Sequence, residues 1–135
     1  MSIVYTELTL TNDVDTCNVE LGYIKRDEIR QITTQAIVDT GAWTLVINEK
    51  TREKLGLRDK GFGEANLADG QKAYYPMVGP LEIWWKNRHM ICEALVMPDA
   101  PDVLLVALPL EHMDLTINPK RELVGVHGDK EIHRV

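Results

Sequence analysis

The residue with the clearest capacity for chemistry is Asp39, in the segment AIVDTGAWTLVI that spans residues 36–47. Its carboxylate follows the apolar run 36–38 and precedes a Thr-Gly turn, after which the chain is apolar again at residues 45–47. Carboxylates are rarely interior unless they are paired, because isolated charges are costly to bury. Asp39 therefore needs either a partner or a structural role as a turn residue that bonds its own backbone.

Other catalytic side chains are scarce. The only serine is Ser2, at a terminus expected to be mobile, which disfavours a serine hydrolase. No HExxH motif is present, and the only two neighbouring histidines fall in the polar stretch HGDKEIH at residues 127–133, where a solvated end is favoured over a metal site. Cys92 lies in the apolar run MICEALVM, where a free cysteine is usually part of the core. Neither a metal nor a cofactor is expected.

The bulk composition is that of one soluble globular domain. The chain has 135 residues, of which 44% are hydrophobic and 27% charged. Its net charge of −6 and pI near 5.2 argue against a nucleic-acid surface. No apolar run approaches the length of a membrane helix, and the start resembles no signal peptide. Two cysteines are too few for a disulfide framework, which favours a reducing compartment. Together with the charge and hydropathy, this predicts a cytoplasmic protein without membrane or nucleic-acid partners.

The elements that position Asp39 are mainly short strands. Residues 4–10 alternate in the manner of a strand, Asn12-Asp13 is typical of a turn, and residues 19–24 and 29–38 are predicted to be two further strands. The last of these leads directly into Asp39. A short helix is predicted to follow Asn48, a good N-cap, and to end at Gly56, and the glycine-containing segment DKGFGE then favours a loop.

The second half of the chain is predicted to form two hairpins and a closing segment. Asp69-Gly70 is a strong signal for a tight hairpin whose arms are EANLA and QKAYYPMV, and residues 86–88 separate the strands 81–85 and 90–97. A buried strand at 103–108, a helical turn at 109–113 and strands at 115–117 and 122–126 complete the pattern. We therefore expect a mostly β protein, a closed or sandwich-like barrel with one principal short helix.

The segment Val38 to Ala42, Val-Asp-Thr-Gly-Ala, resembles the active-site loop of retropepsin-like aspartic proteases, the single-lobe relatives of pepsin. The similarity extends from residue 4 to about residue 126 and is greatest to the small bacterial and cyanobacterial members. It includes a glycine-tipped hairpin where such enzymes carry their flap, and DVLLVALPLEHMDLTINPKRELV, which is similar to the family's buried strand, short helix and final strand. The resemblance implies a protease domain over residues 1–126 and a C-terminal tail over 127–135.

The resemblance implies peptide hydrolysis by two carboxylates that share one proton, one accepting a proton from water while the other donates to the carbonyl oxygen. With a single Asp-Thr-Gly and room for one lobe, the partner of Asp39 is expected to be Asp39 of a second copy, which makes the chain a homodimer acting on a peptide or protein substrate. Thr40 would hydrogen-bond across the two-fold axis, Gly41 would present backbone to the substrate, and Ala42 would keep the wall small. The Asp69-Gly70 hairpin would close over the peptide, with Tyr74, Tyr75 and Met77 as candidate contacts.

Two positions depart from the family pattern. In the buried strand, Val106 stands where glycine usually follows two apolar residues, and a valine needs extra room beside the Asp39 loop. Trp43 replaces a small acidic residue and indicates a bulkier, more apolar cleft wall. Three interpretations follow: an active homodimeric endopeptidase, a catalytically impaired dimer that binds peptides without cleavage, and a monomeric β-barrel in which the motif is accidental.

Overall fold

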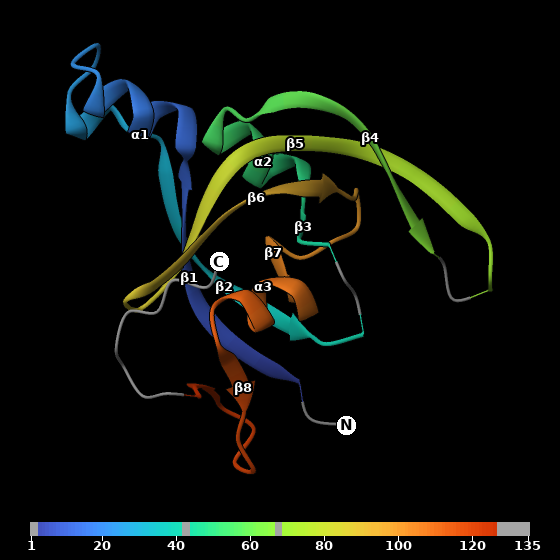
Figure 1. The fold of residues 1–135 in the computed structure, drawn as a ribbon. Coiled ribbons are helices and arrows are strands. Elements are labelled where there is room, and N and C mark those ends of the chain that lie inside the picture. Colours follow the sequence, from blue (N-terminus) through green and yellow to red (C-terminus); the bar gives the residue numbers. More distant parts are fainter. Residues whose placement is uncertain (1–2, 42–43, 67–68, 127–135) are drawn as a thin grey trace.

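A closed six-stranded barrel forms the body of the molecule (Figure 1). The computed structural model describes residues 3–41, 44–66 and 69–126. The barrel strands follow the order β1 (Val4–Asn12), β2 (Gln31–Asp39), β7 (Val103–Val106), β3 (Val46–Ile47), β6 (Arg88–Val96) and β5 (Lys72–Trp85), and pairing of β1 with β5 closes it. The expected mostly β, closed-barrel class is confirmed.

The barrel interior holds the hydrophobic core. Its fully buried members come from nearly every strand and include Leu8, Leu10, Ile47, Ile83 and Leu105. Trp84 and Trp85 alternate faces as expected, since Trp85 is 3% exposed and Trp84 lies half-buried on the outside. Removing one such core side chain to alanine costs about 2–5 kcal/mol, so this core is what holds the strands in register.

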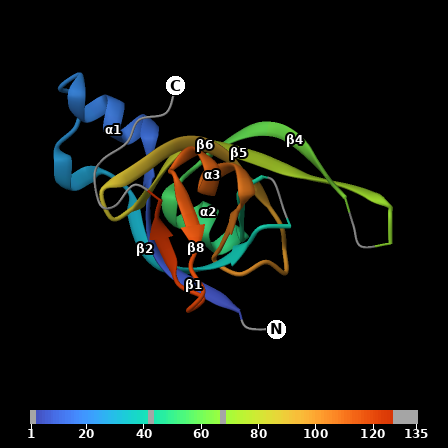
Figure 2. The ribbon, with the colours of Figure 1, turned by 60° about the horizontal axis from the view of Figure 1, so that its bottom comes forward.

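A long hairpin of β4 (Arg58–Asn66) and β5 projects from the barrel in both ribbon views (Figures 1 and 2). Its turn carries Asp69-Gly70, as predicted. The segment DKGFGE, expected as a loop, is instead part of β4, with a bulge between Asp59 and Phe62 where Gly61 has a φ of +100°. Pairing with the long β5 overrides the weak local strand preference of this glycine-containing segment.

The helix α2 (Glu49–Leu55) follows the capping signals read from the sequence. The side chain of Asn48 accepts a hydrogen bond from the Thr51 N–H at 2.9 Å, and Gly56 ends the helix in the left-handed conformation. Beyond the barrel strands, α3 (Ala107–His112) begins two residues before the predicted helical turn and shortens the expected 103–108 strand to β7. The strands β8 (Leu115–Ile117) and β9 (Leu123–Gly125) form a separate small hairpin.

The segment between β1 and β2 was predicted wrongly. A turn at Asn12-Asp13 and a strand over residues 19–24 were expected, but the structure has α1 (Asp13–Glu20) followed by the 3-10 turn η1 (Arg26–Glu28). Asn12 caps α1 by accepting from the Asp15 N–H at 3.1 Å, and Asp15 binds the Arg30 guanidinium at 2.9 and 3.0 Å. This ion pair joins residues 15 positions apart, so local sequence pattern does not reveal it, and α2 is not the one principal helix.

None of the helices in the described part of the chain is long and apolar enough to cross a membrane.

Candidate active site

Asp39 is the last residue of β2 and lies at the rim of the barrel. On one side β2 pairs with β1, which places Val38 opposite Val4, and on the other it runs parallel to β7, which places Asp39 opposite Val106. Two neighbouring strands therefore hold the backbone that leads into Asp39. The Asp39 residue itself is exposed, in contrast to the core residues a few positions before it.

The Asp39 carboxylate is oriented by its own loop. Its Oδ1 accepts a hydrogen bond from the Gly41 N–H at 2.9 Å. A Cβ atom on Gly41 would lie 3.3 Å from that oxygen, closer than ordinary packing, so a side chain there would crowd the carboxylate. Within the described part of the chain, no second carboxylate binds Asp39. One chain thus provides one oriented carboxylate.

Val106, the departure from the family pattern, is accommodated without strain. Val106 is fully buried and lies opposite Asp39 in the β2–β7 pairing. Its backbone has φ −120° and ψ 179°, an extended conformation that any residue adopts. The position therefore has no backbone requirement for glycine, and the Gly41–Asp39 hydrogen bond forms with valine present.

A cavity of about 480 Å³ lies beside the Asp39 loop, with Thr40 on its rim. Thr40 is exposed, and most of the cavity wall comes from α3 and β8, through Leu110, Leu115 and Ile117. Glu111 and Asp114 add two acidic groups to this mostly apolar wall. The surface next to the candidate catalytic residue is therefore hollowed and largely apolar.

The hairpin predicted as a flap has two distinct faces. Tyr74 is 65% exposed, whereas Tyr75 and Met77 are half-buried and lie on the opposite face of β5. Met77 packs across Gly63 of β4, because a Cβ atom at Gly63 would lie 2.8 Å from the Met77 Sδ. Of the three candidate contacts, only Tyr75 and Met77 therefore share the inward face. At the turn, the Asp69 Oδ1 accepts from the Gln71 N–H at 2.9 Å, and Gly70 has a φ of +84°.

A buried ion pair supports the cavity wall and was missed in the sequence, where residues 86–88 suggested only a turn. Arg88 is fully buried, and its Nη1 donates to the carbonyl oxygens of Met113 at 3.0 Å and Asp114 at 2.6 Å. Its guanidinium also lies 3.7 Å from the Asp114 carboxylate. A cation that binds the carbonyls after a helix completes their hydrogen bonding, so Arg88 holds the corner between α3 and β8.

The remaining candidates from the sequence have different outcomes. Ala42, Trp43 and the tail 127–135 lie outside the described residues. Burial raises the pKa of the Cys92 thiol to about 12, so Cys92 stays protonated at neutral pH and packs against the core as predicted. In the described ranges, no group of three or more histidine, cysteine or acidic side chains is arranged to hold a metal ion.

Known proteins are similar to this chain in sequence pattern and in fold. The model of a family described as "Aspartyl protease" matches residues 27–107, more than half of the chain. Among solved structures, the fold is similar to the retroviral protease-like domain of Ddi1 from Leishmania major, with a TM-score of 0.54 and 16% identity, covering 93% of this chain and 86% of that chain. At this identity the similarity concerns the fold alone. No curated protein matches the chain significantly in sequence.

Proposed function

Because this chain belongs to the aspartyl protease family, with a retropepsin-like fold, we propose that it is an aspartic endopeptidase that acts as a homodimer. The observation that carries the proposal is the single exposed Asp39 carboxylate, oriented by Gly41 at the end of β2. The protease domain would comprise residues 1–126, and the substrate would be a peptide or protein segment.

The proposed chemistry uses Asp39 from each of two chains. Two carboxylates a few ångströms apart cannot both ionise cheaply, so the pair holds one shared proton. The ionised carboxylate accepts a proton from the attacking water, and the protonated one donates to the carbonyl oxygen of the scissile bond. Thr40 would stabilise the pair by a hydrogen bond across the axis, and Gly41 would offer its backbone to the substrate.

Two surfaces support the homodimer and substrate roles. The apolar cavity on whose rim Thr40 lies would be covered when two Asp39 loops meet, because it adjoins the proposed axis. The β4–β5 hairpin carries Tyr75 and Met77 on one face, where they would contact a bound peptide as the hairpin closes. Trp43 and Ala42 would form the nearby cleft wall.

The test is cleavage of a diverse peptide library by the wild-type protein and by Asp39→Asn, between about pH 3 and about pH 8. We expect wild-type cleavage that pepstatin inhibits and at least a thousandfold lower rate for Asp39→Asn, since roughly this much is lost with a general acid or base.

Asp59→Asn is the matched control, because Asp59 is exposed and its Oδ1 accepts from the Gly61 N–H at 3.1 Å, the same local geometry as Asp39 and Gly41. It should cleave at the wild-type rate. Equal cleavage by all three proteins would exclude Asp39 as the catalytic group, and no cleavage by the wild type would favour a peptide-binding dimer.

A further inference from the structure

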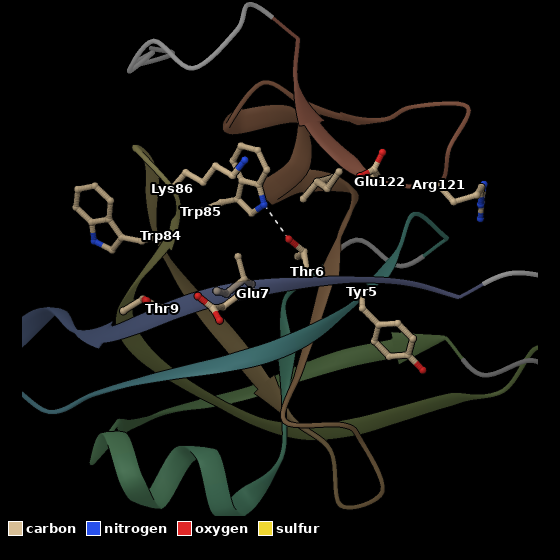
Figure 3. Close-up of a pocket in the computed structure, with 11 residues that line it drawn as sticks. Tyr5, Thr6, Glu7, Thr9, Trp84, Trp85, Lys86, Arg121 and Glu122 are labelled. Atoms are coloured by element: carbon tan, nitrogen blue, oxygen red, sulfur yellow. Dashed lines mark hydrogen bonds between the residues drawn. The ribbon is translucent and has the colours of Figure 1, made fainter.

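A groove of about 490 Å³ runs along the edge of β1 that faces away from β2 (Figure 3). Five consecutive residues of β1, 5–9, line one wall, and residues 121–123, where β9 begins, line the other. The end of β5 and its turn, residues 84–86, close the groove. Because consecutive residues of a strand point to opposite faces, a wall made of all five is the edge of the strand and not one of its faces.

This edge of β1 is only partly paired. The β1–β2 ladder covers Val4 to Thr11 without a register shift, whereas the β1–β5 ladder covers only Thr9 to Asn12. The reason is that the chain turns at Lys86, with a φ of +51°, and returns as β6. Among the strands that the structure describes, none continues the ladder along residues 4–8 on this side.

Within the described ranges, the main-chain groups of β1 that lack a ladder partner on this side belong to two residues. The Asn12 N–H donates to the Arg30 carbonyl oxygen at 2.9 Å, which lies on the β2 side. Main-chain groups alternate in direction along a strand, so the even-numbered residues of β1 face β2 and the odd-numbered ones face the other way. Thr9 is the last odd residue paired with β5, so the N–H and C=O groups of Tyr5 and Glu7 point into the groove.

Several polar side chains of the groove wall already have partners. The Trp85 Nε1 donates to the Thr6 Oγ1 at 2.8 Å, and the Lys86 ammonium lies 4.8 Å from the centre of the Trp85 ring (Figure 3). The charges that line the groove balance, with Glu7 and Glu122 against Lys86 and Arg121. Net charge therefore does not select a ligand, which leaves the main-chain groups of β1 as a recognition element.

We propose that this groove binds an extended segment of another polypeptide, which adds to β1 as a further strand. Four main-chain groups at alternate-residue spacing are complementary to an extended main chain, and strand addition to a free sheet edge uses this pairing. Residues 121–123 bound the groove on the side opposite β1. The segment should lack proline at the positions that pair with Tyr5 and Glu7.

The groove is separate from the proposed catalytic dyad, so it can be tested in Asp39→Asn protein, in which peptides are not cleaved. The probe is a pool of soluble nine-residue peptides in which apolar and polar residues alternate, at up to about 1 mM. Residue-resolved amide hydrogen exchange is the readout. In the free protein, the amides of Tyr5 and Glu7 should exchange fast and those of Thr6 and Leu8 slowly, because only the latter face β2.

With peptide bound, we expect the exchange of Tyr5 and Glu7 to slow at least tenfold while that of Thr6 and Leu8 is unchanged. Glu7→Pro removes the N–H that faces the groove and leaves the β2 side intact, so it should weaken binding about tenfold. Glu7→Ala, which keeps the N–H, should bind as the parent does. Methylating alternate peptide amides gives a second test on unaltered protein, since only one of the two sets should abolish binding.

Three results would overturn the proposal. Slow exchange of Tyr5 and Glu7 in the free protein would mean that the edge is already covered. Comparison with a chain ending at residue 126, and with dilute protein, would then assign the cover to the tail or to a second copy. Absence of protection by any peptide in the pool would show that the edge does not add a strand. Equal loss of binding in Glu7→Pro and Glu7→Ala would assign binding to the Glu7 side chain instead.

Discussion

At the scale of single residues, Asp39 and Asp59 show why local geometry alone does not define a catalytic group. Each accepts a hydrogen bond from the N–H of a glycine two positions later, at 2.9 and 3.1 Å. The first ends a central barrel strand beside a cavity, whereas the second lies in β4, at the edge of the sheet. The expected turn role of Asp39 and its proposed catalytic role are thus compatible, because the hydrogen bond to the loop uses one of the two carboxylate oxygens.

The Val106→Gly variant distinguishes an effect of Val106 on catalysis from its contribution to packing. Because Val106 is fully buried and its backbone is extended, the substitution should lower the free energy of unfolding by roughly 2–4 kcal/mol and leave kcat/KM per folded molecule unchanged. Urea unfolding and peptide kinetics measure the two quantities. Val103→Gly, a buried position in the same strand, is the control for destabilisation alone. A gain in kcat/KM for Val106→Gly only would show that valine impairs the site.

Thr40→Val tests the proposed contact across the axis. Thr40 is exposed in the single chain, so replacing its hydroxyl by a methyl group should leave unfolding unchanged. It should weaken the dimer about tenfold, or about 1.4 kcal/mol, through loss of a hydrogen bond. Sedimentation over a concentration series measures this. Thr33→Val, which removes an exposed hydroxyl bonded to Thr9 at 2.9 Å, should not change the dimer. Equal dissociation of both variants would contradict a specific role for Thr40.

At the scale of elements, the ion pair that holds α1 makes stability depend on pH. Hydrogen bonds from Arg30 hold the pKa of Asp15 below its usual value. The stabilisation is therefore fully present above the usual pKa of about 4 and is lost as pH falls through the lower folded pKa. At pH 7, Asp15→Asn should lower the free energy of unfolding by about 1–3 kcal/mol, and this difference should shrink below about pH 4.

Urea unfolding of the wild type and of Asp15→Asn, at neutral and at acidic pH, measures this difference. Asp27→Asn is the control, because Asp27 is an exposed acidic residue in the same segment between β1 and β2. This substitution should change the free energy of unfolding little at either pH. If the cost of Asp15→Asn were the same at both pH values, the stabilising contact would not involve the ionised carboxylate.

The elements that could be predicted from sequence are those whose signals are local. Asn48 and Gly56 bound α2, and Asp69-Gly70 marks the hairpin, because each residue acts within a few positions of itself. The helix α1 depends on Arg30, and the strand character of residues 58–63 depends on β5, so both require contacts distant in sequence. The site follows the same division: the Asp39 loop is a local motif, whereas the Arg88–Asp114 pair joins residues 26 apart.

At the scale of the whole molecule, the barrel supports one Asp-Thr-Gly loop at its rim, beside a largely apolar cavity. A reaction that needs two carboxylates cannot be completed by this chain alone if Asp39 is the only contributor. Activity should therefore depend on dimer formation. Activity per chain should rise with protein concentration until the dimer is saturated.

Mixing experiments measure this coupling directly. When wild-type protein and Asp39→Asn are combined in equal amounts, above the dimer dissociation constant and after subunit exchange, about one quarter of the dimers should carry both catalytic residues. Activity per total protein should then be about one quarter of that of the wild type alone. Independent chains would retain about half. Mixing with Asp59→Asn should cause no loss, because that variant keeps Asp39. A value of one half in the first mixture would mean that each chain works alone, whatever its state of assembly.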